Sequence, residues 1–512
     1  MALAKVHLRF VLWGHLMPRR PPQRFAFDAL QIDPDAARPI YRQLEQGLRD
    51  AILAGQLKPS ERLPSTRRLA EDLQIARNTV SLAYAQLMSE GYLEAEVGSG
   101  TRVSRHLPDD LLKTPPPPRS VPPATVGPTL ARRGERVAQL GAWISLPSVP
   151  PRPFRPHVPA LDLFPRHVWR RLSERRLRRM PWHEWGQVLP LGYQPLRQAV
   201  AEYLGVSRGV RCSADQIVIV AGAQQAIEFV SRLLLDEGDV AWMEEPGYTP
   251  ARHVFELAGV EVVSVPLDDE GLSVTAGQER NANARLAYVT PSSQWPTGLT
   301  MSLPRRLELL DWARRQSAWI LEDDYNGEFR YDGRPLPAIQ GLAASGHVVY
   351  MGTFSKVMFP GLRLGYLVIP DRLRDAFRAA RWLADRHSPP FEQAVLTDFI
   401  EEGHFARHVR RMRTAYAARQ QALLESLDRH LGGAVEIIRH ETGLQLLVHA
   451  ASGTEFHSLA AAAERAGVES HLLSLYAAEE LPREGMILGF AAYNEDQIEQ
   501  AVQDWAAEFD RH

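Results

Sequence analysis

Five short apolar runs, each followed directly by a polar motif, constrain the fold of this chain most strongly. They alternate with helical patterns and begin at Ile217, Val240, Leu286, Trp319 and Val348. Strands that alternate with helices along a chain predict an α/β domain with a largely parallel sheet. Ligands of such sheets bind at the carboxyl ends of the strands, so we expect the five polar motifs to converge on one site.

The last apolar run, Val348–Met351, leads into the motif Gly352–Lys356, which contains small hydroxyl residues and one lysine. A lysine that closes a buried strand is costly unless it has a partner or a chemical role. Arg363 follows seven positions later. A lysine can form a Schiff base with the aldehyde of pyridoxal phosphate, and hydroxyl and guanidinium groups can hold its phosphate. The alternative is that Lys356 is a solvated surface charge, as most lysines are.

The motifs after the other runs carry groups that suit the same cofactor. Gln224 lies where a helix opens, and the first N–H groups of a helix can hold a phosphate. Tyr248 follows a Pro-Gly turn and can stack on a pyridine ring. Asp323 follows a buried strand, where a pyridinium nitrogen would pair its carboxylate, and Tyr325 can bond the phenolic oxygen. Metal binding and helix capping are the alternatives for Asp323, and without a histidine or a further carboxylate cluster nearby we expect no metal.

A smaller unit of three helical patterns and a short hairpin precedes this domain. In the third pattern, apolar residues from Val80 to Leu87 form a buried stripe, which leaves Arg77 and Asn78 on the outer face. Two short helices joined by a tight turn are typical of a helix-turn-helix, whose second helix enters the major groove of DNA. The alternative is a small helical domain with a solvated polar face. The run Val97–Val103, with its glycines, predicts a two-stranded wing.

This unit resembles the winged helix of the GntR family of bacterial transcription regulators. The resemblance lies in the runs Leu63–Ala70, Arg77–Val80 and Glu90–Leu93. It implies that the unit binds a double-stranded DNA operator. The residues that it implies as DNA contacts are Arg67, Arg77, Asn78 and Thr79, with Gly98 at the tip of the wing. Val97 stands where members of the family often carry a basic or polar wing residue.

From Phe154 onward the chain resembles the fold-type I aminotransferases. The matching motifs are Leu191–Arg197, Ala221–Ala226, Glu245–Tyr248, Asp323–Tyr325, Phe329–Tyr331 and Thr353–Lys356. With the winged helix in front, the chain is similar to the MocR-type (GabR-like) regulators of the GntR family. This resemblance implies Lys356 as the Schiff-base lysine, with Asp323 and Tyr325 as its catalytic partners on the cofactor ring. The other cofactor contacts that it implies are Tyr248, Ala223, Gln224, Thr353, Ser355 and Arg363.

Four positions depart from the pattern of these families. Trp295 stands where aminotransferases usually carry an asparagine that bonds the cofactor, and Ser293 where the regulators often carry a histidine. Pro250 stands where a GABA-sensing member has an arginine. Aminotransferases also carry an arginine for the substrate carboxylate near the C-terminus, and here Arg483 is the nearest candidate. We therefore expect neither efficient transamination nor GABA as the ligand.

Composition limits the remaining possibilities. A chain of 512 residues suggests two to four domains, and a formal net charge of -2 means that any DNA-binding surface must be local. Cys212 is the only cysteine, which excludes an intrachain disulfide, and no apolar run is long enough to span a membrane. We predict an N-terminal extension at 1–36, the winged helix at 37–106, a proline-rich linker at 107–150 and the aminotransferase-like domain at 151–512.

The leading interpretation is a cytoplasmic, homodimeric transcription regulator that binds pyridoxal phosphate. It would sense a small amine or amino acid through the Lys356 aldimine. One alternative is a functional aminotransferase with a vestigial DNA-binding head, against which the intact recognition helix argues. Another is a DNA-binding protein whose second domain is only a dimerisation scaffold, against which Lys356, Asp323 and Arg363 argue.

Overall fold

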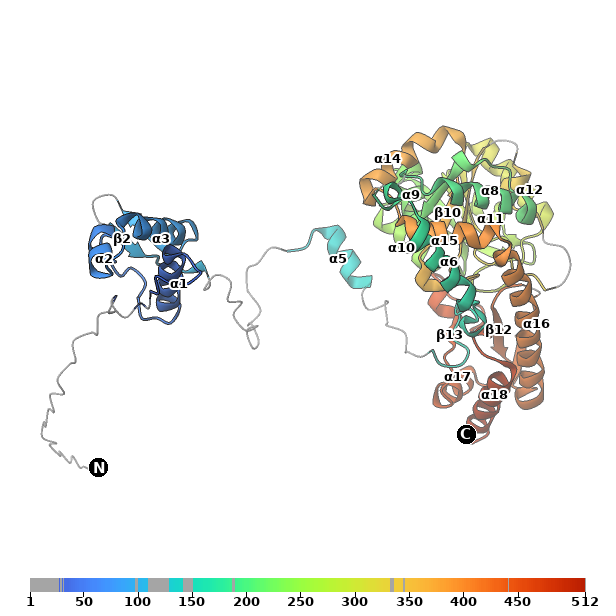
Figure 1. The fold of residues 1–512 in the computed structure, drawn as a ribbon. Helices are drawn as coiled ribbons and strands as arrows, with labels where there is room; N and C mark the ends of the chain where they lie inside the picture. The colour runs from blue at the N-terminus through green and yellow to red at the C-terminus, as the bar shows by residue number, and fades with distance from the viewer. Residues whose placement is uncertain are drawn as a thin grey trace, which may run out of the picture. The chain divides into compact units, whose positions relative to one another are not determined.

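The computed structural model divides the chain into two compact units, Met1–Thr129 and Leu130–His512 (Figure 1). The residues that it describes are 27, 30, 32–96, 100–108, 129–140, 151–186, 189–331, 336–343, 346–440 and 442–511. Gly98, the predicted wing tip, and most of the predicted linker 107–150 lie outside these residues. The predicted domain boundaries therefore stay predictions.

The first unit has the three helices and the hairpin that the sequence predicts. These are α1 (Ile40–Leu53), α2 (Thr66–Asp72), α3 (Arg77–Ser89), β1 (Leu93–Glu96) and β2 (Gly100–Val103). The apolar faces of the three helices share one core, and the Ser65 hydroxyl caps α2 by accepting the N–H of Arg68 at 3.3 Å. The wing begins at Leu93 rather than at Val97 as predicted. Leu93 pairs with Val103, and burial of both side chains sets this register.

The second unit is built on an eight-stranded sheet in the order β3-β10-β9-β8-β7-β4-β5-β6. Its strands are β3 (Ile217–Val220), β4 (Val240–Glu245), β5 (Glu261–Asp268), β6 (Gly271–Leu272), β7 (Leu286–Val289), β8 (Trp319–Asp323), β9 (Val348–Thr353) and β10 (Gly365–Val368). The pairs from β9 across to β5 are parallel, whereas β10 runs antiparallel to β9 and β3. The predicted, mostly parallel sheet is confirmed, and all five predicted strands belong to it.

Helices pack on both faces of this sheet and bury its apolar side chains. One face carries α9 (Ala223–Leu234), α10 (Thr249–Leu257) and α14 (Arg374–Asp385). The other face carries α8 (Gln194–Arg208), α11 (Val274–Arg280), α12 (Leu303–Gln316), α13 (Ile339–Leu342) and α15 (Pro390–Glu401). Next to α15 lie α6 (Arg166–Arg179) and α7 (Trp182–Gly186). This layering leaves the carboxyl ends of the parallel strands as the open edge of the sheet.

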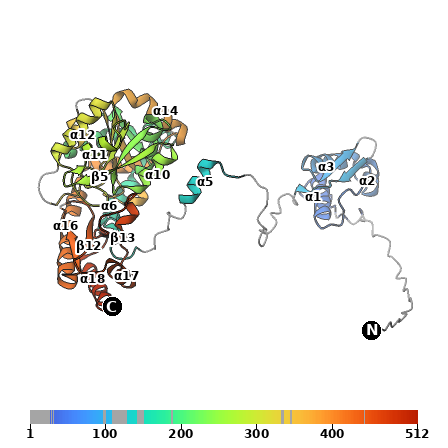
Figure 2. The ribbon, with the colours of Figure 1, turned by 180° about the vertical axis from the view of Figure 1, so that it is seen from behind.

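A smaller antiparallel sheet forms the C-terminal part of the unit, in the order β11-β12-β14-β13. Its elements are α16 (His404–Leu431), β11 (Val435–Ile438), β12 (Gln445–Ala450), α17 (Phe456–Arg465), β13 (His471–Leu472), β14 (Met486–Gly489) and α18 (Glu495–Phe509). Figure 2 shows this group at the end of the unit away from α12 and α14. Residues 151–160 run along it: the Gly489 N–H donates to the Phe154 carbonyl at 2.7 Å, and Arg155 pairs with Glu469 at 2.6 Å.

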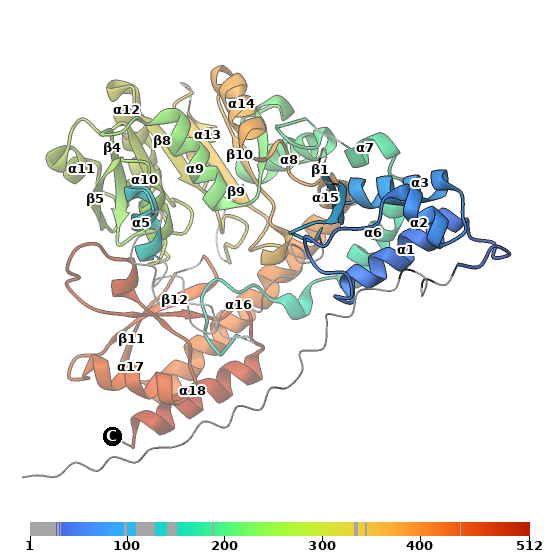
Figure 3. The same ribbon diagram turned by 90° about the vertical axis from the view of Figure 1, so that its left-hand side faces the viewer.

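A further helix, α5 (Arg132–Gln139), lies inside the predicted linker 107–150. It contacts α10 of the same unit (Figure 3). Among the helices described, none has the length and hydropathy needed to cross a membrane.

The core of the first unit can be tested with two leucines of α3. Leu87 is fully buried, whereas Leu82 is 51% exposed. Leu87→Ala should lower the free energy of unfolding of this unit by about 2–5 kcal/mol, because it leaves a cavity. Leu82→Ala should change it by no more than about 0.5 kcal/mol. Hydrogen exchange of α1–α3 amides in increasing urea measures both values, and equal effects would contradict the assigned core.

Candidate functional site

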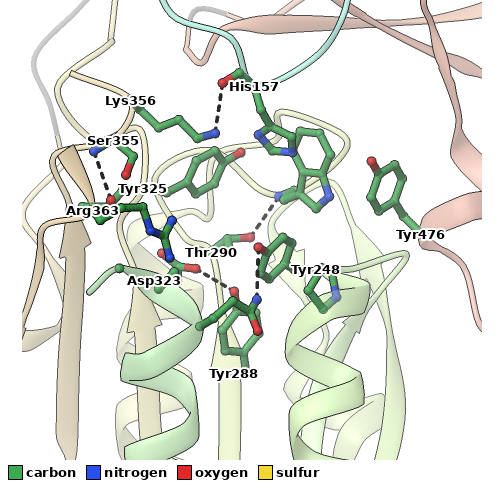
Figure 4. A pocket seen from close by; sticks show the side chains of 16 residues that line it. His157, Tyr248, Tyr288, Thr290, Asp323, Tyr325, Ser355, Lys356, Arg363 and Tyr476 are labelled. Carbon is green, nitrogen blue, oxygen red and sulfur yellow. Dashed lines mark hydrogen bonds between the residues drawn. The ribbon is translucent and has the colours of Figure 1, made fainter. Parts of the chain in front are cut away.

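A cavity of about 350 Å³ opens at the carboxyl ends of β7, β8 and β9 (Figure 4). All the cofactor residues expected from the sequence line it, namely Ala223, Gln224, Tyr248, Asp323, Tyr325, Thr353, Ser355, Lys356 and Arg363. They come from different strand ends, and the sheet brings them together as expected from its topology. Their individual roles stay predictions.

Lys356 lies just beyond β9 at the rim of the cavity. Its Nζ donates a hydrogen bond to the backbone carbonyl of His157 at 3.1 Å. Burial lowers the pKa of Lys356 to about 8, and the nearby Asp323 carboxylate opposes this change. The chain's lysines are Lys5, Lys58, Lys113 and Lys356, so Lys356 is the only lysine of the second unit. A lysine with a lowered pKa is more often uncharged near neutral pH, which is the form that attacks an aldehyde.

Asp323 closes β8 and lies at the floor of the cavity. It is 5% exposed, and its carboxylate accepts a hydrogen bond from the Tyr288 hydroxyl at 2.7 Å. Burial raises the pKa of Asp323 to about 7, against the effect of that hydrogen bond. A buried carboxylate of this kind is stabilised by a cation. The protonated ring nitrogen of a pyridine would be such a partner.

Arg363 and the groups around it favour a bound anion, whereas Asp323 favours a cation. This residue has a left-handed backbone (φ 50°), which costs about 1–3 kcal/mol for a residue other than glycine. Its guanidinium lies over Gly222, where an added Cβ would stand only 3.5 Å away. Gly222 begins α9, whose first N–H groups have no side-chain cap. In the part of the chain that the structure describes, no acidic group is paired with Arg363, and the helix end and the guanidinium together suit a phosphate.

These three features fit pyridoxal phosphate, which has an aldehyde, a basic ring nitrogen and a phosphate. Tyr248 adds a ring beside the cavity, with its hydroxyl 3.3 Å from Gln224 Nε2. The described residues contain no group of three or more His, Cys, Asp or Glu side chains that could share a metal ion. The donor set of this cavity therefore suits an organic phosphate.

Several lining residues were not assigned to the site from the sequence, namely His157, Tyr288, Thr290 and Tyr476. The sequence contains a hint that Tyr288 belongs to the site, because a tyrosine inside a buried strand needs a hydrogen-bond partner for its hydroxyl. It contains no such hint for His157 and Tyr476, since they reach the cavity from outside the five strand ends. Trp295, noted only as a departure from the family pattern, also lines the cavity.

Arg483 is the arginine nearest in sequence to the position where aminotransferases carry their carboxylate ligand. Arg483 does not line the cavity: its side chain is 42% exposed and pairs with Glu436 at 2.6 Å. It also donates to the Ala450 carbonyl at the edge of the small sheet. These surface partners hold its guanidinium away from the site.

The predicted DNA contacts lie on the exposed side of α2 and α3. Arg77, Asn78 and Thr79 form the first turn of α3, and the first two of these side chains are exposed. The Arg67 side chain on α2 is 79% exposed and pairs with Glu71 at 3.2 Å. An exposed ion pair of this kind is weak, so the Arg67 guanidinium can exchange Glu71 for a phosphate. The start of α3 is thus free to meet base edges.

Comparisons with known proteins match both units of the chain. Residues 40–103 match the gntR family of bacterial regulatory proteins, and residues 173–476 match aminotransferase class I and II. The probable rhizopine catabolism regulatory protein MocR of Rhizobium meliloti is 41% identical over 481 residues, which cover 94% of this chain and 96% of that protein. The chain belongs to the MocR-type transcription regulators. The HTH-type transcriptional regulator TauR of Rhodobacter capsulatus is 34% identical over 78% of this MocR-type chain and 81% of its own.

The larger unit of this MocR-type regulator also resembles solved enzymes. The α-aminoadipate aminotransferase LysN of Thermus thermophilus has a TM-score of 0.66 and 28% identity, over 75% of this chain and 97% of the enzyme. That enzyme was solved with N-(5'-phosphopyridoxyl)-L-leucine. A DNA-binding winged helix joined to a fold-type I aminotransferase domain, as the sequence predicted, is confirmed.

The lowered pKa of Lys356 predicts how capture of pyridoxal phosphate depends on pH. The rate should rise as pH passes through about 8, because the uncharged amine is the reactive form. Borohydride reduction followed by peptide mass spectrometry measures the rate at Lys356, with exposed Lys58 as the control for non-specific labelling. A rate at Lys356 that is flat from pH 7 to 9, or that follows Lys58, would contradict the assignment.

Proposed function

We propose that this regulator binds pyridoxal phosphate and changes its affinity for DNA when a small amine or amino acid reacts at Lys356. The observation that carries the proposal is the cavity itself, where a lone lysine faces Asp323 and Arg363 (Figure 4). When bound, the cofactor supplies an aldehyde that a primary amine can take over from a lysine. Arg363 and the start of α9 would hold its phosphate, and Asp323 would pair with its protonated ring nitrogen.

The contact between Lys356 and His157 gives this reaction a route to the DNA-binding unit. A Lys356 amine freed by the effector can donate to the His157 carbonyl, as it does here at 3.1 Å. His157 belongs to residues 151–160, which directly follow the predicted linker and are fixed to β14 at Phe154. An effector can shift DNA binding only if it favours one arrangement of the dimer over another, and we propose that the Lys356–His157 contact differs between the two arrangements. The two states would then differ in whether the Lys356 amine is bonded to the cofactor or free.

The proposed assembly is a cytoplasmic homodimer formed through residues beyond about 154. The larger unit exposes large apolar side chains in and just after α6 and α7, with Leu177 at 58%, Trp182 at 85% and Leu189 at 60%, and exposed apolar patches are typical of protein interfaces. A symmetric dimer carries two winged helices, which suits an operator with two half-sites.

A working aminotransferase is the second candidate, because the cavity has the full set of expected cofactor residues. The surface position of Arg483 argues against it, since the carboxylate of an amino-acid substrate then lacks its expected partner. Steady-state turnover with an amino donor and a keto acid would favour this candidate.

The sensing proposal is tested by replacing Lys356. Wild-type protein incubated with pyridoxal phosphate should show a visible absorbance band, and Lys356→Ala should lose the covalent band while keeping its fold. Addition of an active amine should change both the band and the affinity for an operator selected from random duplexes. In Lys356→Ala the affinity should no longer respond, and a persistent response would refute sensing at Lys356.

The DNA contacts predict two different effects. Arg77→Ala should cost about 1–3 kcal/mol of binding and relax specificity at one base pair, because Arg77 is expected to read a base edge. Arg67→Ala should lower affinity for all sequences and reduce the salt slope by about 1, because a phosphate contact is lost. Arg232→Ala, at an arginine of α9 in the other unit whose side chain is 51% exposed, is the control. If the Arg67 and Arg77 variants both bind DNA like the control, the winged helix does not recognise the operator.

The predicted linker can be tested by deleting Pro115 to Pro118. Cofactor binding should remain, whereas the preferred half-site spacing or the response to effector should change, because the linker sets how far the two heads can spread. Gel-shift assays on operators with varied spacing measure this. Residues 150–512 expressed alone should stay dimeric and yellow. A monomeric fragment would exclude the assembly, and an unaltered response after the deletion would exclude the coupling.

A further inference from the structure

The cavity has a charged side and an uncharged side. Its charged groups are Lys356, Asp323 and Arg363, and each has a counterpart on pyridoxal phosphate in the proposed function. In Figure 4, Arg363 and Tyr476 lie at opposite sides of the cavity. The space left for an effector is therefore the space near Tyr476, and the groups there decide which amine fits.

The described residues that line this second side offer no cation. They are His157, Pro250, Trp295, Tyr325 and Tyr476. His157 is the only one of them that could carry a positive charge, and burial together with the nearby Lys356 amine keeps its pKa well below 6.5. An effector carboxylate would thus face uncharged rings.

The arginines closest along the chain to these lining residues are held elsewhere. Arg252, in the same helix as Pro250, bonds Glu245 at 3.2 Å and Ser264 at 2.9 Å. Arg155, two residues before His157, pairs with Glu469 at 2.6 Å. Neither guanidinium lines the cavity.

Apolar side chains pack against the residues that line this uncharged side. Leu447 and Ile487 pair directly on β12 and β14, and their side chains form one cluster with Trp295, Tyr325 and Tyr476. The Trp295 indole is 1% exposed and packs between two rings: the His157 ring lies 3.8 Å away and the Tyr476 ring 4.9 Å away, edge-on. A carboxylate placed against this cluster would lose its hydration without gaining an ion pair.

On this side the Tyr325 and Tyr476 hydroxyls have hydrogen-bond partners in Gln445 and His471, whereas one further polar group has none among the residues described. The indole N–H of Trp295 is buried and has no hydrogen-bond partner in the described part of the chain. An indole can only donate, and a buried donor without an acceptor is unfavourable. A neutral oxygen of a bound molecule would satisfy it.

We propose that the effector is a primary amine without a carboxylate, carrying a neutral oxygen that accepts the Trp295 indole N–H, and that Trp295 selects it. This inference rests on the proposed function, since the amine must react at Lys356. It narrows the effector from any amine or amino acid to one chemical class. Trp295 acts as a specificity residue beside the reacting groups.

The test compares compounds that differ by one group, using the visible spectrum of full-length protein loaded with pyridoxal phosphate. Tyramine should produce its half-maximal change at a concentration at least tenfold lower than tyrosine, and ethanolamine should act likewise relative to serine. Phenethylamine, which lacks the oxygen, should need several-fold more than tyramine. Each value is normalised to the reaction of the same compound with free pyridoxal phosphate.

Two variants assign the selectivity to the indole. Trp295→Phe keeps an aromatic ring but removes the N–H, so tyramine and phenethylamine should become equivalent. Trp382→Phe, at a 51% exposed tryptophan of α14, should behave as wild type. In each variant, retention of the visible band reports an intact site.

The contradicting outcomes are distinct. Amino acids acting at equal or lower concentrations than their amines would overturn the inference while leaving the proposed function in place. Equal action of tyramine and phenethylamine on the wild-type protein would exclude the indole contact. If no amino compound changes the spectrum of the loaded protein, the proposed function itself fails, and the inference with it.

Discussion

In its described part, the larger unit gathers three charged groups around one cavity without giving any of them a complete partner. Among the described residues, Asp323 has one hydrogen-bond donor, the Tyr288 hydroxyl, Lys356 has a carbonyl for its amine, and Arg363 adopts a strained backbone beside the start of α9. Such groups are tolerated where a ligand supplies the missing charges. Pyridoxal phosphate offers a ring cation, a phosphate and an aldehyde, so one molecule can complement all three.

The winged-helix unit depends on a different kind of interaction. Its core is a plain apolar cluster, and its function depends on a few exposed side chains at the start of α3 rather than on buried charge. With a net charge of -2, the chain cannot bind DNA through its overall field, so binding requires the local geometry of Arg77 and its neighbours.

Much of the fold and of the cofactor site could be predicted, because the sequence patterns that indicate them are local. A buried strand ending in a polar motif, as at Asp323 or Lys356, reveals both its structure and its place at the sheet edge. Residues brought in by long-range packing gave no such signal: His157 arrives along β14, and Tyr476 from the end of the small sheet. The antiparallel strand β10 was missed because its pairing with β3 joins distant segments. The surface partner of Arg483, Glu436, could not be predicted because the two residues lie on segments that are separate in the sequence.

The central claim is that release of Lys356 from the cofactor changes DNA binding. The most direct measurement is operator affinity with and without an active amine, before and after borohydride reduction of the loaded protein. Reduction ties the cofactor permanently to Lys356, so an amine can no longer displace it. The native protein should change its affinity about 5–150-fold on adding the amine, and the reduced protein should not respond. An equal response in both forms would contradict the account.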